Sequence, residues 1–179
     1  PLRGLRLAFE AWPMIAAAVP AAHFVVVGQQ QEGYGLALDT NAETNHLDAA
    51  LSGLPDSVDR NHIHVLEWMA HGEMLKLLRH SACHLALSYP YTLSWSVLEA
   101  MACGAPIASS NTAAMPEVLG GAAAYFNPND VTDMTRVLLN LYNDPEERLR
   151  LQEESKKRAS RYVWQETKRK TVDIIRSCV

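Results

Sequence analysis

Paired cysteines are missing from this sequence. Its three cysteines, Cys83, Cys103 and Cys178, are widely spaced, so neither a disulfide framework nor a zinc site of the CxxC type is indicated. No apolar run approaches the roughly 20 residues that a membrane-spanning helix requires, and residues 1–20 lack the layout of a secretory signal. These absences predict a cytoplasmic protein with free thiols.

Positive charge is scarce over most of the chain. Residues 1–143 contain 6 Lys or Arg against 13 Asp or Glu, whereas residues 144–179 contain 10 against 7. The acidic body argues against a general nucleic-acid binder, because such proteins gain most of their affinity by neutralising phosphates. A small anionic ligand needs only a few local donors and stays compatible with this balance. The basic tail is more typical of a solvated helix, and peripheral contact with a membrane is kept as an alternative.

Helical and strand-like patterns alternate along the chain. Apolar residues at helical spacing predict helices at 3–18, 45–54, 72–80, 94–102 and 130–141, the last capped by Asn129 or Asp130. Short apolar runs predict strands at 23–28, 62–67, 83–88, 106–109 and 122–126. This order predicts an α/β fold with a doubly wound, mainly parallel sheet, whose ligands bind at the carboxyl ends of the strands. Two charged helices at 145–179 are expected to lie across the domain surface.

Several motifs of nucleotide, metal and hydrolase sites are incomplete. GQQQEGYG at 28–35 follows a strand, but Tyr34 and Gly35 stand where a phosphate-binding loop needs Lys and Ser or Thr, and GxGxxG is absent. His62 and His64 share a strand face without a carboxylate or cysteine at ligand spacing, so no metal site is predicted. No GxSxG elbow surrounds any serine, so hydrolase chemistry is not indicated.

One stretch, SYPYTLSWSVLEAMACGAP at 88–106, combines a strand end, a polar loop, a helix start and an isolated acid. Between Arg79 and Glu117 the only Lys, Arg, Asp or Glu is Glu99. A carboxylate among apolar residues costs several kcal/mol of desolvation unless hydrogen-bond donors meet it. Glu99 is therefore expected to have a partner, either in the protein or in a ligand.

The helix start in this stretch predicts an anion site. Leu93, Ser94 and Trp95 would present backbone amides to a phosphate. Glu99 follows one turn later, where an acid can accept hydrogen bonds from ribose hydroxyls. Phosphate and ribose would then lie one helical turn apart. The competing interpretation is that Glu99 bonds a neighbouring backbone group or side chain, and the spacing alone does not choose between the two.

LSYPYTLSWSVLEAMACGAPIASSNTAAMPEVL resembles the donor-binding signature of retaining GT-B glycosyltransferases of family four, in which a strand precedes E-G-F-G-L-x-x-L-E-A-M-A-x-G-x-P and a later P-E-V. RGLRLAFEAW is similar to the K-G-x-x-x-L-x-x-A helix of that family, and the resemblance extends over essentially the whole chain. It implies a nucleotide-sugar-binding Rossmann-like domain at 1–144 with carboxy-terminal helices packed on it at 145–179. The amino-terminal acceptor domain of such enzymes is absent from this sequence.

The resemblance also implies roles for individual residues. Glu99 corresponds to the glutamate that holds the ribose hydroxyls, and Ser94 to Ser96 correspond to the helix start that cradles the phosphates. Arg3 replaces the lysine that grips the donor diphosphate. Base recognition, which is largely through backbone groups in such folds, is expected near Trp68 and Met69.

The chain departs from the family pattern beside the donor sugar. Tyr91 stands where the family has its first glutamate, and Thr92 replaces a glycine. The contact of that acid with the transferred sugar is then lost, or is taken over by Tyr91, Thr92 or Glu117. This departure puts catalysis in question more than binding.

The resemblance implies metal-independent transfer with retention, from a nucleotide diphosphate sugar to a glycan or lipid-linked acceptor, driven by stabilisation of the departing diphosphate. The alternative is a non-catalytic binding or assembly domain that has kept the fold. An epimerase of the same architecture ranks last, because its catalytic residues cannot be placed here.

Overall fold

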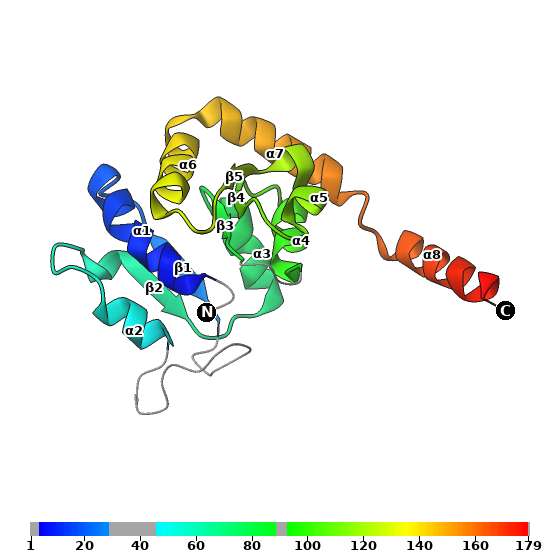
Figure 1. The fold of residues 1–179 in the computed structure, drawn as a ribbon, viewed down its shortest axis with the longest axis horizontal. Coiled ribbons are helices and arrows are strands. Elements are labelled where there is room, and N and C mark those ends of the chain that lie inside the picture. Colours follow the sequence, from blue (N-terminus) through cyan, green and yellow to red (C-terminus); the bar gives the residue numbers. More distant parts are fainter. Residues whose placement is uncertain (1–3, 29–45, 89–92, 179) are drawn as a thin grey trace.

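The strands of this domain are parallel (Figure 1). The structure is a computed structural model that describes residues 4–28, 46–88 and 93–178. β1 (Phe24–Val27) pairs with β2 (Ile63–Leu66), and β4 (Ile107–Ser110) lies between β3 (His84–Ala86) and β5 (Ala124–Phe126). All three described pairings are parallel, which confirms the predicted α/β fold. The described strands form two ladders, β1-β2 and β3-β4-β5, where one continuous sheet was expected.

Helices alternate with these strands, as the apolar spacing predicted. They are α1 (Leu5–Ala18), α2 (His46–Ser52), α3 (His71–His80), α4 (Trp95–Cys103), α5 (Met115–Leu119), α6 (Val131–Asn143), α7 (Pro145–Ala159) and α8 (Trp164–Ser177). Two short 3₁₀ turns, Arg60–His62 and Gly120–Ala122, precede β2 and β5. Asp130, not Asn129, caps α6, because its side chain accepts a hydrogen bond from the backbone amide of Asp133 at 3.0 Å.

β4 is buried on both of its faces, which places the core on either side of β3-β4-β5. Every residue of β4 is buried, and neighbouring side chains on a strand point to opposite faces. Ile107 packs with residues of α3, α4 and α5, such as Met101. Ala108 packs on the other side with residues of α1, α6 and α7, such as Leu151. A further cluster joins α1 and α2 to β1 and β2.

The two carboxy-terminal helices pack differently. In α7, Leu151 and Ser155 are fully buried, the Ser155 hydroxyl donates to the Ala122 carbonyl at 3.2 Å, and Arg158 donates to the Val118 carbonyl. α8 has no buried residue and runs away from the body in Figure 1. α7 thus packs on the body of the domain, whereas no residue of α8 is buried.

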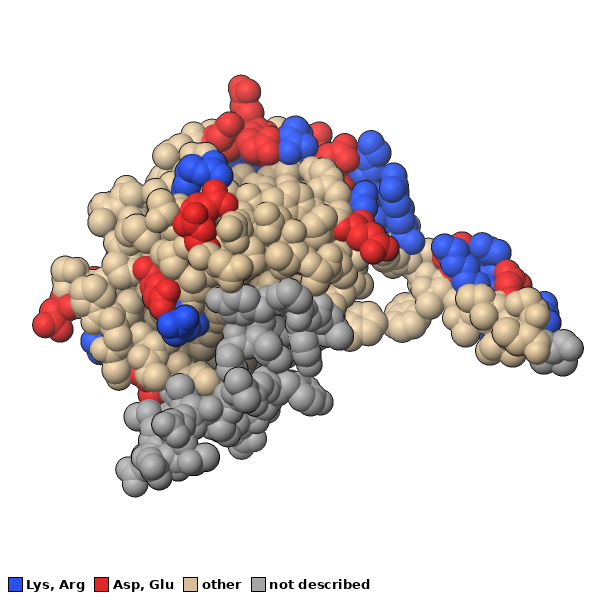
Figure 2. All heavy atoms as spheres, in the orientation of Figure 1, with Lys and Arg blue, Asp and Glu red and all other residues tan. Residues whose placement is uncertain are grey.

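Charged side chains pair with one another along α8. Arg169 bonds Glu166 and Asp173 of the same helix. Ile174 and Ile175 stay 64% and 59% exposed. Figure 2 shows Lys and Arg gathered at the end of α7 and along α8. No helix in the described part of the chain is both long and apolar enough to cross a membrane.

Replacement of Gly4 by alanine is expected to destabilise the fold. Gly4 caps α1 with φ +64°, and a Cβ there would overlap the buried side chain of Leu87. Gly4→Ala should lower the free energy of unfolding by about 2–5 kcal/mol, since a left-handed backbone costs about 1–2 kcal/mol and overpacking about 1–3 kcal/mol. Urea denaturation measures this. Gly72→Ala in α3 is the control, because its Cβ would meet nothing within 4 Å; equal stability of the two variants would refute the close approach.

Acid is expected to weaken the fold through His84 at the start of β3. Burial lowers the pKa of His84 to about 4 from 6.5, so the unfolded chain binds this proton more readily than the folded chain does. The stability that His84 contributes is thus fully present above pH 6.5 and is lost as the pH falls toward 4. Urea denaturation between pH 7.5 and 4 should show a shallower pH dependence for His84→Gln than for His80→Gln, which changes an exposed residue. Identical slopes would contradict the assignment.

Candidate functional site

The residues of the central stretch lie at the carboxyl edge of the strands. α4 begins at Trp95 beyond β3, and α3 begins at His71 beyond β2. Gly4, at the start of α1, lies against Leu87 just after β3. Three helix starts therefore border the edge at which open parallel sheets bind their ligands.

Among the described residues, no side chain caps the first turn of α4. Ser94 is the N-cap residue with extended backbone, φ −87° and ψ 137°, yet its hydroxyl bonds the Ser96 hydroxyl at 2.8 Å instead of a backbone amide. In α6 and α7, by contrast, the side chains of Asp130 and Asp144 cap the first turn. Amides at an uncapped helix start are the donors that anions bind in proteins.

Hydroxyl groups from β4 and the turn after it hold the end of β3 that leads toward α4. Thr112 donates to the Ser88 carbonyl at 3.2 Å, and the Ser88 amide donates to the Ser110 hydroxyl at 3.4 Å. Leu93, just before α4, packs against the core cluster of α3, α4 and α5. The serine and threonine contacts were not predicted, although the run SSNT directly after a buried strand is a visible pattern.

Glu99 has a side-chain partner that the sequence did not indicate. Its Oε1 lies 3.0 Å from Nε2 of His71, the first residue of α3. The Glu99 side chain is 35% exposed and that of His71 69%, so the carboxylate is half-open to solvent and its desolvation is smaller than expected. The hydrogen bond occupies one carboxylate oxygen. The ribose role of Glu99 remains a prediction.

Trp95 makes a second contact that was not predicted. Its ring lies 6.1 Å from that of Trp164, at 28°, and the two side chains are 68% and 72% exposed. The start of α8 thereby rests on the start of α4. Local sequence patterns cannot show such a contact, because the two tryptophans are far apart in the chain.

The other predicted residues divide into two groups. Trp68, 77% exposed, and Met69, half-buried, lie in the segment between β2 and α3 that leads to His71. Arg3, Tyr91 and Thr92 lie outside the described residues. The structure thus places Ser94, Ser96 and Glu99 on α4 and its cap and adds His71 to them.

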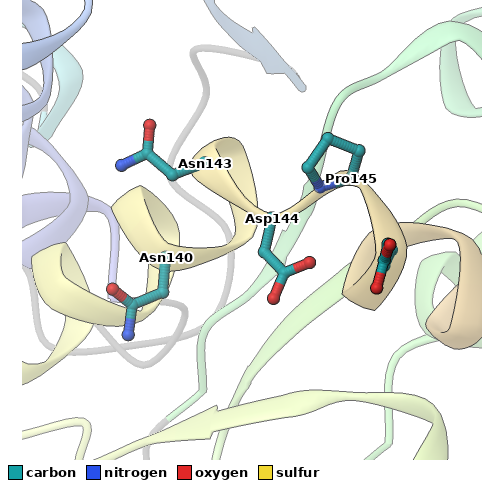
Figure 3. Close-up of a pocket in the computed structure, with 5 residues that line it drawn as sticks. Asn140, Asn143, Asp144 and Pro145 are labelled. Atoms are coloured by element: carbon teal, nitrogen blue, oxygen red, sulfur yellow. The ribbon is translucent and has the colours of Figure 1, made fainter.

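Two surface hollows in the described part of the chain lie elsewhere. Figure 3 shows one at the turn from α6 to α7, lined by Asn140, Asn143, Asp144, Pro145 and Glu146. The Asp144 carboxylate there accepts from the Glu147 amide at 2.9 Å, which is a helix-capping role. A second hollow lies between α1 and α2. Neither hollow contains a residue of the central stretch.

His64 of β2 and His62 of the turn before it lie near the amino end of β1, away from this edge. Nε2 of His64 lies 2.8 Å from Nδ1 of His23, and His62 donates from Nδ1 to the Ala22 carbonyl at 3.0 Å. The rings of His23 and His62 stack at 4.4 Å. Within the described ranges no group of three or more His, Cys, Asp or Glu could hold a metal ion.

A sequence model of the family described as "Glycosyl transferases group 1" matches residues 1–144. The chain belongs to this family of glycosyltransferases. MMP alpha-(1->4)-mannosyltransferase of Mycolicibacterium hassiacum is 32% identical over 146 residues, which are 79% of this chain and 34% of the relative. Serotype-specific mannosyltransferase WbdA of Escherichia coli is 36% identical over 76 residues, 42% of this chain and 9% of the relative. This glycosyltransferase chain spans about a third or less of the length of these relatives.

Solved structures show the same fold. HepE of Anabaena in complex with UDP-glucose superposes with a TM-score of 0.78 at 16% identity, over 100% of this chain and 46% of that one. The alpha,alpha-trehalose 6-phosphate synthase of Burkholderia multivorans superposes with a TM-score of 0.78 at 18% identity, over 99% of this chain and 40% of that one. The predicted membership of the GT-B glycosyltransferases is confirmed.

Proposed function

We propose that this glycosyltransferase domain binds a nucleotide diphosphate sugar and serves a retaining, metal-independent transfer of the sugar to a glycan or lipid-linked acceptor. The observation that carries the proposal is the geometry of α4, where Glu99 follows one turn after an uncapped helix start. The family match supports transferase chemistry, and HepE, which shares the fold, was solved with UDP and with UDP-glucose.

Each part of the donor has a matching chemical group in this arrangement. The first amides of α4 face the diphosphate, and the aligned peptide dipoles add about 0.3–1 kcal/mol for a negative group placed there. The Glu99 carboxylate accepts from the ribose hydroxyls, and the base lies near Trp68 and Met69. Arg3 lies outside the described residues, and we assign it as the cation for the diphosphate because it stands where the family has a lysine.

Stabilisation of the departing diphosphate is the chemical contribution that we assign to this domain. Charge develops on the diphosphate as the bond to the sugar breaks, and amides with fixed direction stabilise it without reorganisation. We assign donor binding and this stabilisation to the domain, so the isolated chain should bind the donor and scarcely turn it over.

Calorimetric titration of the chain with UDP, GDP, ADP and their glucose or mannose derivatives tests this function. We expect saturable binding of at least one nucleotide in the presence of EDTA, with an affinity that added Mg²⁺ leaves unchanged. Absence of binding to every compound in the panel would refute donor binding. A strict requirement for Mg²⁺ would refute metal independence alone.

The second candidate function is a binding or assembly domain without catalysis, which Tyr91 favours because it replaces the first family glutamate. Transfer activity of the full-length protein, compared with its Tyr91→Phe variant, distinguishes the two. Product formation by the unmodified protein would exclude the second function. Nucleotide binding without any product would favour it.

A further inference from the structure

His71 contacts the carboxylate on which the proposed donor site depends. Its Nε2 lies 3.0 Å from Oε1 of Glu99, although the two residues belong to different helices. A carboxylate accepts and does not donate, so the proton of this bond is on Nε2 of His71. The bond leaves Oε2 of Glu99 for another donor.

The separation of the two residues is fixed by the packing of α3 on α4. Leu78 of α3 packs in one core cluster with Val97 and Met101 of α4. Farther along the two helices, the Cys103 thiol of α4 donates to the Leu75 carbonyl of α3 at 3.7 Å. The two packed helices therefore fix the backbone positions from which His71 reaches Glu99.

Other charged groups of α3 do not compete for this contact. Glu73, the acid nearest to His71 in sequence, bonds Lys76 at 2.8 Å. Glu99 is the acid with which His71 pairs, and in the described ranges Nδ1 of His71 makes no hydrogen bond. The hydrogen bond from His71 can therefore hold the Glu99 carboxylate in one orientation.

We propose that His71 is a positioning residue for donor binding, which directs Oε2 of Glu99 toward the ribose hydroxyls of a nucleoside diphosphate. The inference rests on the proposed donor site. Without His71 the carboxylate would rotate among several orientations, and the nucleotide would have to fix one of them on binding. His71 also joins α4 to the segment of Trp68 and Met69, so ribose and base contacts would be set together.

Three variants of the chain test this role by calorimetric titration with the nucleoside diphosphate that the unmodified chain binds most tightly. His71→Phe keeps a planar ring without the donor and should weaken binding about 5- to 20-fold. His71→Gln can still donate to Glu99 and should stay within about 3-fold of the original affinity. His80→Phe, an exposed change at the other end of α3, should leave affinity unchanged.

A double-variant comparison separates positioning from a general structural effect. When Glu99 is already glutamine, His71→Phe should weaken binding by less than about 2-fold more, because the carboxylate that His71 orients toward the ribose is gone. Thermal unfolding checks that each variant folds. Unchanged or tighter binding by His71→Phe would overturn the inference and leave the donor site standing, since tighter binding means that His71 competes with ribose. Failure of the unmodified chain to bind any nucleotide would instead overturn the donor site itself.

Discussion

Leu151→Ala is expected to lower the free energy of unfolding of this domain by about 2–5 kcal/mol. Leu151 lies in α7 with no exposed surface and packs with residues of α1, β4, β5 and α6. Truncation removes the transfer free energy of the lost carbons and leaves a cavity that such a packed region cannot fill. The size of this effect measures how much the packing of α7 against the core contributes to the free energy of unfolding.

Urea denaturation measures the loss, and α7 itself offers the control. Leu149 is 57% exposed on the same helix, so Leu149→Ala makes the same chemical change with a shift within about 0.5 kcal/mol. Similar stabilities for the two variants would mean that α7 is not anchored through Leu151.

Glu99→Gln is expected to weaken nucleoside diphosphate binding by about 1.5–3 kcal/mol, or roughly 10- to 150-fold. Glutamine keeps the size of the side chain but replaces a charged acceptor by a neutral amide, so the charge-assisted bonds to the ribose hydroxyls are lost. Calorimetric titration of both proteins measures the difference.

Glu73→Gln is the matched control for this change. Glu73 is an exposed acid on α3 whose partner is Lys76, so the same loss of one negative charge there should leave the affinity unchanged. Equal weakening by both variants would indicate a general effect of net charge. Unchanged affinity of Glu99→Gln would leave Glu99 with the hydrogen bond to His71 as its only role.

Much of this fold could be predicted because it depends on local patterns. The buried run at Ile107–Ser110 is apolar or small on both faces, as a central parallel strand requires. The predicted helix at 94–102 agrees closely with α4, and Gly104 after it has the left-handed φ of +70° that favours glycine. α8 could not be placed, because its amphipathic pattern does not specify which surface covers the apolar side.

The candidate site was only partly predictable for a related reason. Glu99 was evident as an isolated charge, but its partner His71 is on another helix, and the pair depends on how α3 packs against α4. The stacking of Trp95 on Trp164 likewise joins distant segments. Local spacing determines which residues lie on one helix, whereas packing determines which helices meet.

The central claim is that the Glu99 carboxylate binds the ribose hydroxyls of a nucleotide at the start of α4. Its most direct test is calorimetric titration of the original chain and Glu99→Gln with the best-binding nucleoside diphosphate and with its 2′,3′-dideoxy form. We predict that the original chain binds the dideoxy form at least about 10-fold more weakly, and that Glu99→Gln barely distinguishes the two compounds. Equal affinity of the original chain for both compounds, or undiminished discrimination by Glu99→Gln, would contradict the claim.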